Sequence, residues 1–282
     1  MKSKPFISLA SFLAFNLVAN AQNIFVADYS ANVVDEITLG GGESVFASGL
    51  NNPYGIAFDN AGDLFVADDG TDNIYKYAPG SARSTFATVP NYPHGLACDT
   101  DGNLYVANFF DGSVTKITPG GAQSTYATGL NGPNQMAFDS AGNLYVADYY
   151  GGSVTKITPG GVQSTLISGF STADGVAVNS AGDVFVAEGS PVSILEIAPG
   201  GAQSTFATGL SNVNGMAFDP AGNLFVGDSG TGIIYEYTPG GARSIVGSGF
   251  EQPNGLAIQP VPEPSILAFL AISAMALVVR RR

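Results

Sequence analysis

Residues 102–108 read Gly-Asn-Leu-Tyr-Val-Ala-Asn, and this stretch returns with small changes every 40 residues along the chain. Further copies begin at residues 62, 142, 182 and 222, and residues 23–28 read Asn-Ile-Phe-Val-Ala-Asp in the same register. The span from Ala21 to Pro260 contains 240 residues, which is six periods with nothing left over. The sequence is therefore built from six copies of one unit.

One copy, from Pro93 to Gly132, illustrates the unit. Runs of apolar, β-branched and aromatic residues predict its four strands at residues 94–99, 104–108, 113–118 and 123–128. Asp99–Gly102 predicts a hairpin, and Pro119-Gly120-Gly121 predicts a type II turn with Gly at the positive-φ position. Four antiparallel strands in a period of this length are typical of a β-propeller blade. We therefore predict an all-β fold, a six-bladed β-propeller of four-stranded antiparallel blades.

The first copy lacks its inner strand, and the chain carries a matching strand, Pro253–Pro260, at its far end. We expect this strand to pair beside the N-terminal strand in one shared sheet. Such pairing of the two ends would close the ring and fix the number of blades.

The N-terminus has the features of a secretory signal peptide. Lys2 and Lys4 precede the apolar stretch 6–18, which ends in small residues at Ala19 and Ala21. This order predicts a signal peptide over residues 1–21, with cleavage after Ala21. The propeller is then predicted to span residues 22–260.

Residues 261–282 form a separate C-terminal segment: Val261-Pro262-Glu263-Pro264, an apolar run at 265–279, and Arg280-Arg281-Arg282. The apolar run is short against the roughly 20 residues of a stable span. The basic end predicts a cytoplasmic C-terminus, with the propeller on the far side of the membrane. An ordinary C-terminal anchor is the alternative.

The order of these parts resembles the bacterial PEP-CTERM sorting tail. The resemblance implies processing by an exosortase-type membrane enzyme at Val261, Pro262, Glu263 and Pro264, after transient anchoring in the inner membrane through a C-terminal helix. It also implies export to the cell surface or the medium of a Gram-negative bacterium that makes exopolysaccharide.

The charge of the propeller excludes one class of partner. Five of the ten Lys and Arg residues lie in the two end segments, but only one of the 23 acidic residues, Glu263, does, so residues 22–260 carry a net charge of −17. This field repels phosphate backbones, and we expect no nucleic-acid binding. Cys98 is the only cysteine and stands where other copies have Phe, so it is expected to be a buried apolar residue. We expect a monomer.

Repeats such as Pro53–Asp68 resemble NHL repeats and the wider six-bladed group of gluconolactonase, regucalcin and streptogramin lyase. This resemblance implies a fold, whereas the function of such propellers varies. Comparing the copies separates framework from function. Polar residues recur at two turn positions and are expected to cap backbone: Asp59, Asp99, Asp139, Asn179 and Asp219 at one, and Asp28, Asp68, Asn108, Asp148, Glu188 and Asp228 at the other.

One variable position lies at the entry to each inner strand and is expected to ring one mouth of the central channel: Tyr54, His94, Asn134, Asp174, Asn214 and Asn254. The gluconolactonase and regucalcin resemblance implies a divalent cation such as Ca²⁺ here, with Asn134, Asp174 and Asn254 as metal ligands. That group also uses a Glu, which this chain lacks at these positions. The alternative is that the Asn and Asp side chains only form the turn into the strand.

The second variable region is the loop between the second and third strands, which should place Phe109, Phe110, Tyr149 and Tyr150 beside the channel mouth. Clustered exposed aromatic rings are typical of sugar or protein contacts. The alternative is that one ring of each pair is buried between blades.

These patterns favour an exported surface or matrix protein that binds exopolysaccharide, a small ligand or a surface protein through Tyr54, His94, Phe109, Phe110, Tyr149, Tyr150 and Asn214. A metal-dependent lactonase or hydrolase with a cation at the channel mouth is the alternative, and a purely structural repeat module is a third hypothesis. Chemistry like that of streptogramin lyase needs channel histidines with a Glu, whereas His94 is the only histidine of the chain.

Overall fold

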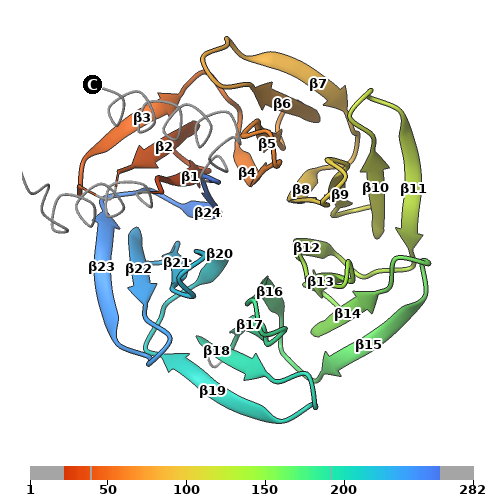
Figure 1. The fold of residues 1–282 in the computed structure, drawn as a ribbon, viewed down its shortest axis with the longest axis vertical. Coiled ribbons are helices and arrows are strands. Elements are labelled where there is room, and N and C mark those ends of the chain that lie inside the picture. Colours follow the sequence, from red (N-terminus) through yellow and green to blue (C-terminus); the bar gives the residue numbers. More distant parts are fainter. Residues whose placement is uncertain (1–21, 39, 191, 261–282) are drawn as a thin grey trace, which may run out of the picture. The chain divides into compact units, whose positions relative to one another are not determined.

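The computed structural model describes residues 22–38, 40–190 and 192–260, so the predicted signal peptide and sorting tail lie outside the described residues. Residues Gln22–Gln259 form one compact unit. It contains 24 strands in six four-stranded antiparallel sheets, arranged as blades around a central axis (Figure 1). The predicted six-bladed propeller is confirmed. In the part of the chain that is described, no helix is long and apolar enough to cross a membrane.

The blades follow one another along the chain, and we number them from the one that contains the N-terminal strand. Blade 1 contains β24 (Pro253–Ile258), β1 (Ile24–Asp28), β2 (Val33–Ile37) and β3 (Glu43–Ala47). Blade 2 contains β4 (Pro53–Phe58), β5 (Leu64–Asp68), β6 (Asn73–Tyr77) and β7 (Ser84–Thr88). Blade 3 contains β8 (Pro93–Cys98), β9 (Leu104–Asn108), β10 (Ser113–Ile117) and β11 (Gln123–Thr128). Blade 4 contains β12 (Pro133–Phe138), β13 (Leu144–Asp148), β14 (Ser153–Ile157) and β15 (Gln163–Ser168). Blade 5 contains β16 (Ala173–Val178), β17 (Val184–Gly189), β18 (Val192–Ile197) and β19 (Gln203–Thr208). Blade 6 contains β20 (Val213–Phe218), β21 (Leu224–Asp228), β22 (Ile233–Tyr237) and β23 (Arg243–Ser248).

The ring closes through strands from both ends of the propeller. β24 pairs antiparallel with β1, from Ile24 opposite Ile258 to Asp28 opposite Pro253. The Asp28 carboxylate also accepts hydrogen bonds from the backbone N–H groups of Glu251 and Gln252, at 2.8 Å each. The predicted closure is therefore confirmed.

The hairpins between the first and second strands of blades 2 to 5 are stabilised by a repeated side-chain contact. Asp99 Oδ1 accepts hydrogen bonds from the backbone N–H groups of Asp101 and Asn103, at 3.0 and 2.8 Å. Oxygens at the equivalent positions 59, 139 and 179 accept the same two bonds in their own blades. The prediction that these side chains cap their turns is confirmed.

The type II turn predicted at Pro119-Gly120-Gly121 is wrong. The positive φ, 84°, belongs to Gly121 and not to Gly120. The Gly121 N–H donates to the Thr118 carbonyl, and the Thr118 N–H donates to the Ala122 carbonyl. This pattern is a type I turn followed by one left-handed residue, a three-residue hairpin loop whose twist matches that of the strands.

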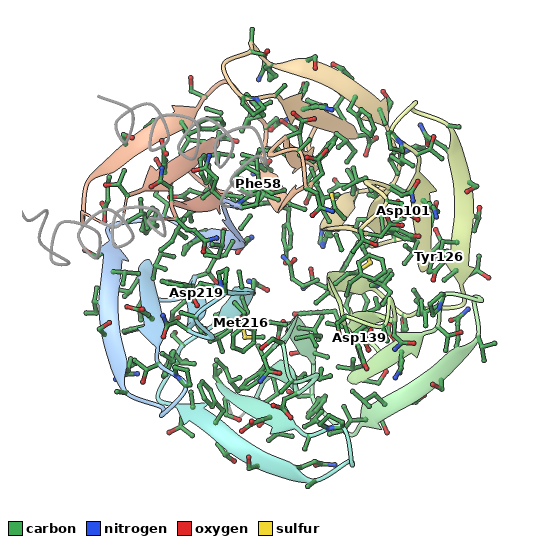
Figure 2. All side chains as sticks on the ribbon, in the orientation of Figure 1. Phe58, Asp101, Tyr126, Asp139, Met216 and Asp219 are labelled. Carbon is green, nitrogen blue, oxygen red and sulfur yellow. The ribbon has the colours of Figure 1, made fainter. Side chains whose placement is uncertain are left out.

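The core lies between neighbouring blades. In blade 2, Phe65 on β5 packs in one cluster with Leu96, Leu104 and Val106 of blade 3. Figure 2 shows side chains filling the spaces between adjacent sheets. Because both faces of a blade are covered in this way, the second strand of a blade is buried along its whole length, as in β5 and β9. Cys98 packs partly buried against the same cluster, and burial raises the pKa of its thiol.

The innermost strands all run in the same direction along the channel. In blades 2 to 6 each begins at the end where the loops between second and third strands lie and ends at the hairpin that leads to the second strand, and β24 has the same direction in blade 1. We call the first end the mouth and the other the base. Asn23 and Gln259 meet at the base, where the Gln259 N–H donates to the Asn23 carbonyl at 2.9 Å.

Candidate functional site

The variable residue at the start of each innermost strand points into the mouth because the strand is irregular there. In β4, regular pairing with β5 breaks between Pro53 and Ile56, and β8, β12, β16, β20 and β24 show a similar irregularity. A bulge of this kind redirects side chains. The six residues that it brings together are all at least nine-tenths buried: Tyr54, His94, Asn134, Asp174, Asn214 and Asn254.

These residues line one hollow of about 380 Å³ at the mouth. All ten residues that the sequence predicted for ligand or metal binding belong to its lining, namely Tyr54, His94, Phe109, Phe110, Asn134, Tyr149, Tyr150, Asp174, Asn214 and Asn254. The structure adds five residues that were not predicted as site residues: Tyr29, Asp69, Tyr92, Asn212 and Gln252.

Two side chains extend across the channel. The Tyr54 hydroxyl from blade 2 donates to Asn214 Oδ1 of blade 6 at 3.4 Å. Gln135 of blade 4 donates from Nε2 to the Asn254 carbonyl of blade 1, on the opposite side of the ring, at 3.2 Å. The position after the mouth residue is Gly in the other five blades, Gly55, Gly95, Gly175, Gly215 and Gly255. Tyr54 and Gln135 therefore narrow the channel beside the hollow.

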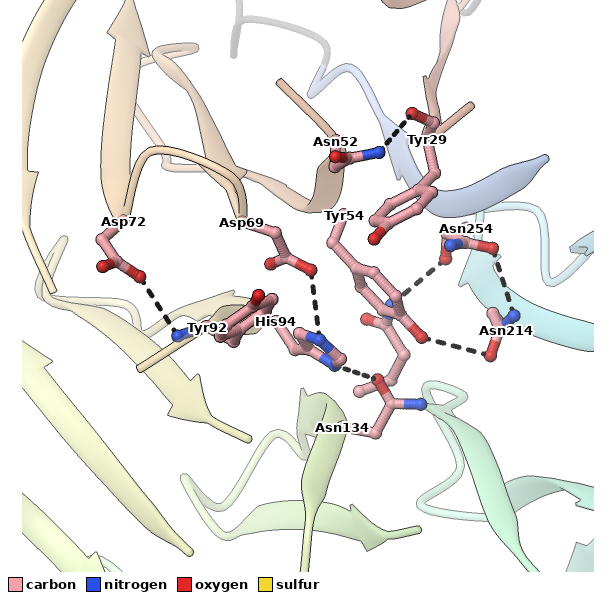
Figure 3. A network of polar contacts seen from close by, with 11 residues as sticks. Tyr29, Asn52, Tyr54, Asp69, Asp72, Tyr92, His94, Asn134, Asn214 and Asn254 are labelled. Atoms are coloured by element: carbon pink, nitrogen blue, oxygen red, sulfur yellow. Dashed lines mark hydrogen bonds and ion pairs between the residues drawn. The ribbon is translucent and has the colours of Figure 1, made fainter. Parts of the chain in front are cut away.

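His94 is held by contacts on both ring nitrogens (Figure 3). Its Nε2 lies 3.2 Å from Asp69 Oδ2, and its Nδ1 lies 3.3 Å from Asn134 Oδ1. The Asn134 amide is oriented by its own donation to the Asp174 carbonyl at 2.8 Å. Because both nitrogens face oxygen acceptors, a doubly protonated ring would donate to both.

The remaining amides at the mouth bond to one another across blades. Asn214 donates from Nδ2 to Asn254 Oδ1 at 3.1 Å and accepts the Tyr54 hydroxyl on its oxygen (Figure 3). These contacts join side chains of different blades and so differ from the local turn contacts that were the alternative.

Two carboxylates border the pocket. Burial raises the pKa of Asp174 to about 6, while a hydrogen bond from the Thr172 hydroxyl at 2.8 Å acts in the opposite direction. Burial also raises the pKa of Asp69, against the effect of His94. Asp69 is 3% exposed, and its Oδ1 atom has no hydrogen-bond partner among the residues that the structure describes.

The arrangement does not suit a divalent cation. The side-chain oxygen of Asn134 faces His94 and that of Asn254 accepts from Asn214, which leaves one carboxylate, Asp174, from the predicted ligand set. Across residues 22–38, 40–190 and 192–260, no three His, Cys, Asp or Glu side chains gather in a way that could hold a metal ion. Affinity for hard cations follows the number of charged oxygen ligands. The cation stays a prediction that this donor set does not favour.

Aromatic rings form one side of the pocket. The His94 ring stacks on Tyr54, with centroids 4.0 Å apart, and on Phe109 at 4.2 Å. Phe109 is buried, whereas Phe110 and Tyr150 are 62% and 60% exposed. Tyr92 is also exposed and meets Phe110 edge to face at 4.8 Å. Thus one ring of this pair, Phe109, is buried, as the alternative interpretation of the aromatic pairs predicted. The other ring, Phe110, lies exposed at the rim.

The chain ends in a segment that matches a known export signal. Residues 260–282 carry a PEP-CTERM protein-sorting motif. The motif marks an exported protein and a substrate of an exosortase. No curated protein matches the chain in sequence.

Solved structures share the propeller fold with this exported protein. A chain of a nidogen/laminin complex superimposes with a TM-score of 0.77 at 15% identity, over 85% of this chain and 99% of that one. A streptogramin B lyase gives 0.66 at 15% identity, over 85% and 87% of the two chains. A candidate gluconolactonase gives 0.65 at 15% identity, over 74% and 82%. At such identities the likeness shows the fold alone, and it includes a laminin-binding assembly as well as enzymes.

Proposed function

We propose that this exported propeller is a carbohydrate-binding protein whose mouth pocket holds a sugar residue of a polysaccharide. The observation that carries the proposal is the exposed aromatic rim of Tyr92, Phe110 and Tyr150 beside a buried polar network. A hexose has an apolar C–H face that packs on aromatic rings, and hydroxyl groups that bond to amides and carboxylates. Both kinds of partner line the same hollow.

The shape of the pocket supports binding at a chain end or at a branch. Tyr54 and Gln135 extend across the channel beneath the mouth. These side chains narrow the channel, which favours entry of a single sugar residue from the rim over passage of a polysaccharide strand. The exposed rings around the rim would contact the neighbouring residues of the polymer.

The contacts of His94 argue against a role for it in catalysis. Its two nitrogens are engaged by Asp69 and Asn134, and its two faces are covered by Tyr54 and Phe109. A general base needs a lone pair within reach of the proton that it removes. We infer that His94 holds the pocket together.

A lactonase or hydrolase remains the second candidate, and Asp174 is the observation that favours it. A buried carboxyl group with a pKa of about 6 is suited to general acid–base chemistry near neutral pH. Hydrolysis of a panel of sugar lactones by the wild type, lost in Asp174→Asn, would support an enzyme. No turnover with any lactone would count against it.

Retention on immobilised polysaccharides tests the binding proposal. Phe110→Ala and Tyr150→Ala should each weaken retention by about tenfold, because each removes a large exposed contact area. Val162→Ala is the matched control, since Val162 is 66% exposed but lies in the β14–β15 loop at the base. Equal retention of all three variants, or no retention of the wild type on any polysaccharide, would contradict the proposal.

A further inference from the structure

We propose that the mouth pocket selects sugars that carry a protonated amine, with the ammonium group held by Asp174 and attracted by the charge of Asp69 on the other side of the pocket. This inference rests on the proposed carbohydrate-binding function and names the class of sugar. It follows from the hydrogen bonds that the buried carboxylates lack, the charges around the pocket, and the rings beside them.

The first observation is the unpartnered oxygen of Asp69. Its Oδ2 atom meets His94, but its Oδ1 atom, in a side chain that is almost completely buried, has no partner among the described residues. Buried polar atoms in native proteins nearly always have a hydrogen-bond partner. An ionised carboxylate accepts and does not donate. Because this Oδ1 atom has almost no accessible surface, the negative charge of Asp69 is only partly compensated and acts on the pocket through space.

The second observation concerns Asp174, which lies on the other side of the pocket. It is 5% exposed, and within the described residues its only side-chain hydrogen bond comes from Thr172 to Oδ2. Its Oδ1 atom is left to accept from a ligand. Two carboxylates thus line the same hollow, and Asp174 is the one with an oxygen that can accept from a ligand.

The third observation is the charge balance of the lining. Among the residues that line the hollow there is no Lys or Arg, and His94 is the only group that can carry a positive charge. One imidazolium cannot neutralise two carboxylates. The domain around them has a net charge of −17, counted over residues 22–260, so its field attracts cations to the mouth.

The rings beside the carboxylates favour an organic cation over a metal ion. Tyr29, Tyr149 and Phe109 line the same hollow, and aromatic faces attract ammonium groups. These rings offer a metal ion at most two neutral phenol oxygens, and the side-chain oxygens of Asn134, Asn214 and Asn254 are engaged as described above. A volume of about 380 Å³ also exceeds what one ion needs and suits a sugar residue.

Calorimetry with two matched oligosaccharides tests the inference. The purified protein is titrated with a glucosamine oligomer, whose amines are free, and with an N-acetylglucosamine oligomer of the same length. We expect the glucosamine oligomer to bind at least about tenfold more tightly, a preference worth about 1.4 kcal/mol. Asp174→Asn and Asp69→Asn should each reduce that preference, and Asp101→Asn, an exposed acid at the base, should not.

The outcomes separate this inference from the proposed function. Equal binding of both oligomers would overturn the amine selectivity and leave carbohydrate binding standing. Binding of neither oligomer, with spermidine bound, would keep the amine site and overturn the sugar. Binding of none of the three would overturn both. Asp69→Asn also weakens the contact between Asp69 and His94, so thermal unfolding is measured for each variant. If Asp69→Asn proves to be unfolded, Asp174→Asn alone tests the inference.

Discussion

A single position in blade 1 departs from the polar pairing used elsewhere. In blade 4, the Thr155 hydroxyl donates to the Asp148 carboxylate at 2.6 Å, and in blade 3 Asn108 and Thr115 make the equivalent contact. Blade 1 has Asp35 at the position of Thr155, beside Asp28. Burial, then Asp28 and then Glu43, raise the pKa of Asp35 to about 6. Blade 1 therefore holds a carboxylate where blades 3 and 4 hold a threonine hydroxyl.

Asp35→Thr should stabilise the protein above about pH 6. The folded pKa of Asp35 lies above its unfolded value, so its ionisation costs stability as the pH rises from about 4 to about 6. The gain should be about 1 kcal/mol after allowance for solvent screening, and should vanish below about pH 4. Urea unfolding at a series of pH values measures it, and a gain that is independent of pH would contradict this cause.

His94→Phe should destabilise the protein by about 3 kcal/mol although the aromatic stack is kept. Phe can pack between Tyr54 and Phe109, but it leaves the Asp69 carboxylate buried without a partner. Adding Asp69→Leu should restore part of the loss, because the unpaired charge is then removed. The double-mutant cycle is measured by urea unfolding, and strictly additive losses would show that His94 and Asp69 are not coupled.

At the scale of the elements, the loops at the mouth are packed on the chain that leads to the next blade. The Gly152 carbonyl in the β13–β14 loop accepts from the N–H groups of Gly169 and Phe170. Gly152 has a φ of 54°, and a Cβ atom there would lie 2.1 Å from the Phe170 carbonyl oxygen. By contrast, Gly161 at the base has a φ of 79° and open space around it.

Gly152→Ala should therefore cost clearly more stability than Gly161→Ala. Both changes impose the left-handed penalty of about 1 kcal/mol, but only the first meets the backbone of the next connection. We expect Gly152→Ala to cost at least about 2 kcal/mol more. Thermal unfolding of the two variants compares them directly, and equal melting temperatures would show that the β13–β14 loop moves freely.

Strands and turns could be predicted from the sequence where contacts within a single blade determine them. The 40-residue period predicted the strands of blade 3 to within one residue at each end, and comparison of the copies found the mouth residues. Contacts between blades were not predictable in this way. Asp69 meets His94 from the neighbouring blade, and Gln135 reaches a strand on the opposite side of the ring. Such pairs follow from the curvature of the whole ring and have no fixed spacing in the sequence.

The whole molecule depends on one pair of strands from distant parts of the chain. β24 and β1 share a sheet, and Asp28 holds the backbone that leads into β24. Blade 1 cannot be completed until the last strand of the domain has been made. We therefore expect cooperative folding of all six blades.

Removal of residues 253–260 should abolish cooperative unfolding, because it exposes the apolar edge of β1 and the core of blade 1. A circular permutant is the matched control. It joins Gln259 to Gln22 through a short linker and opens the chain at Gly80-Ser81, an exposed turn of blade 2. The permutant keeps β24 beside β1 and should retain a single sharp transition in circular dichroism. A truncated chain that unfolds like the permutant would contradict the role of closure.

The meeting of Asn23 and Gln259 at the base has a consequence for how the protein is displayed. The export signal begins at residue 260, directly after the last strand, so a tether to an envelope would be attached at the base. The aromatic rim lies at the opposite end of the propeller from this attachment point, which would leave it open to an approaching polymer. Released or tethered, the protein would present the same open side to its surroundings.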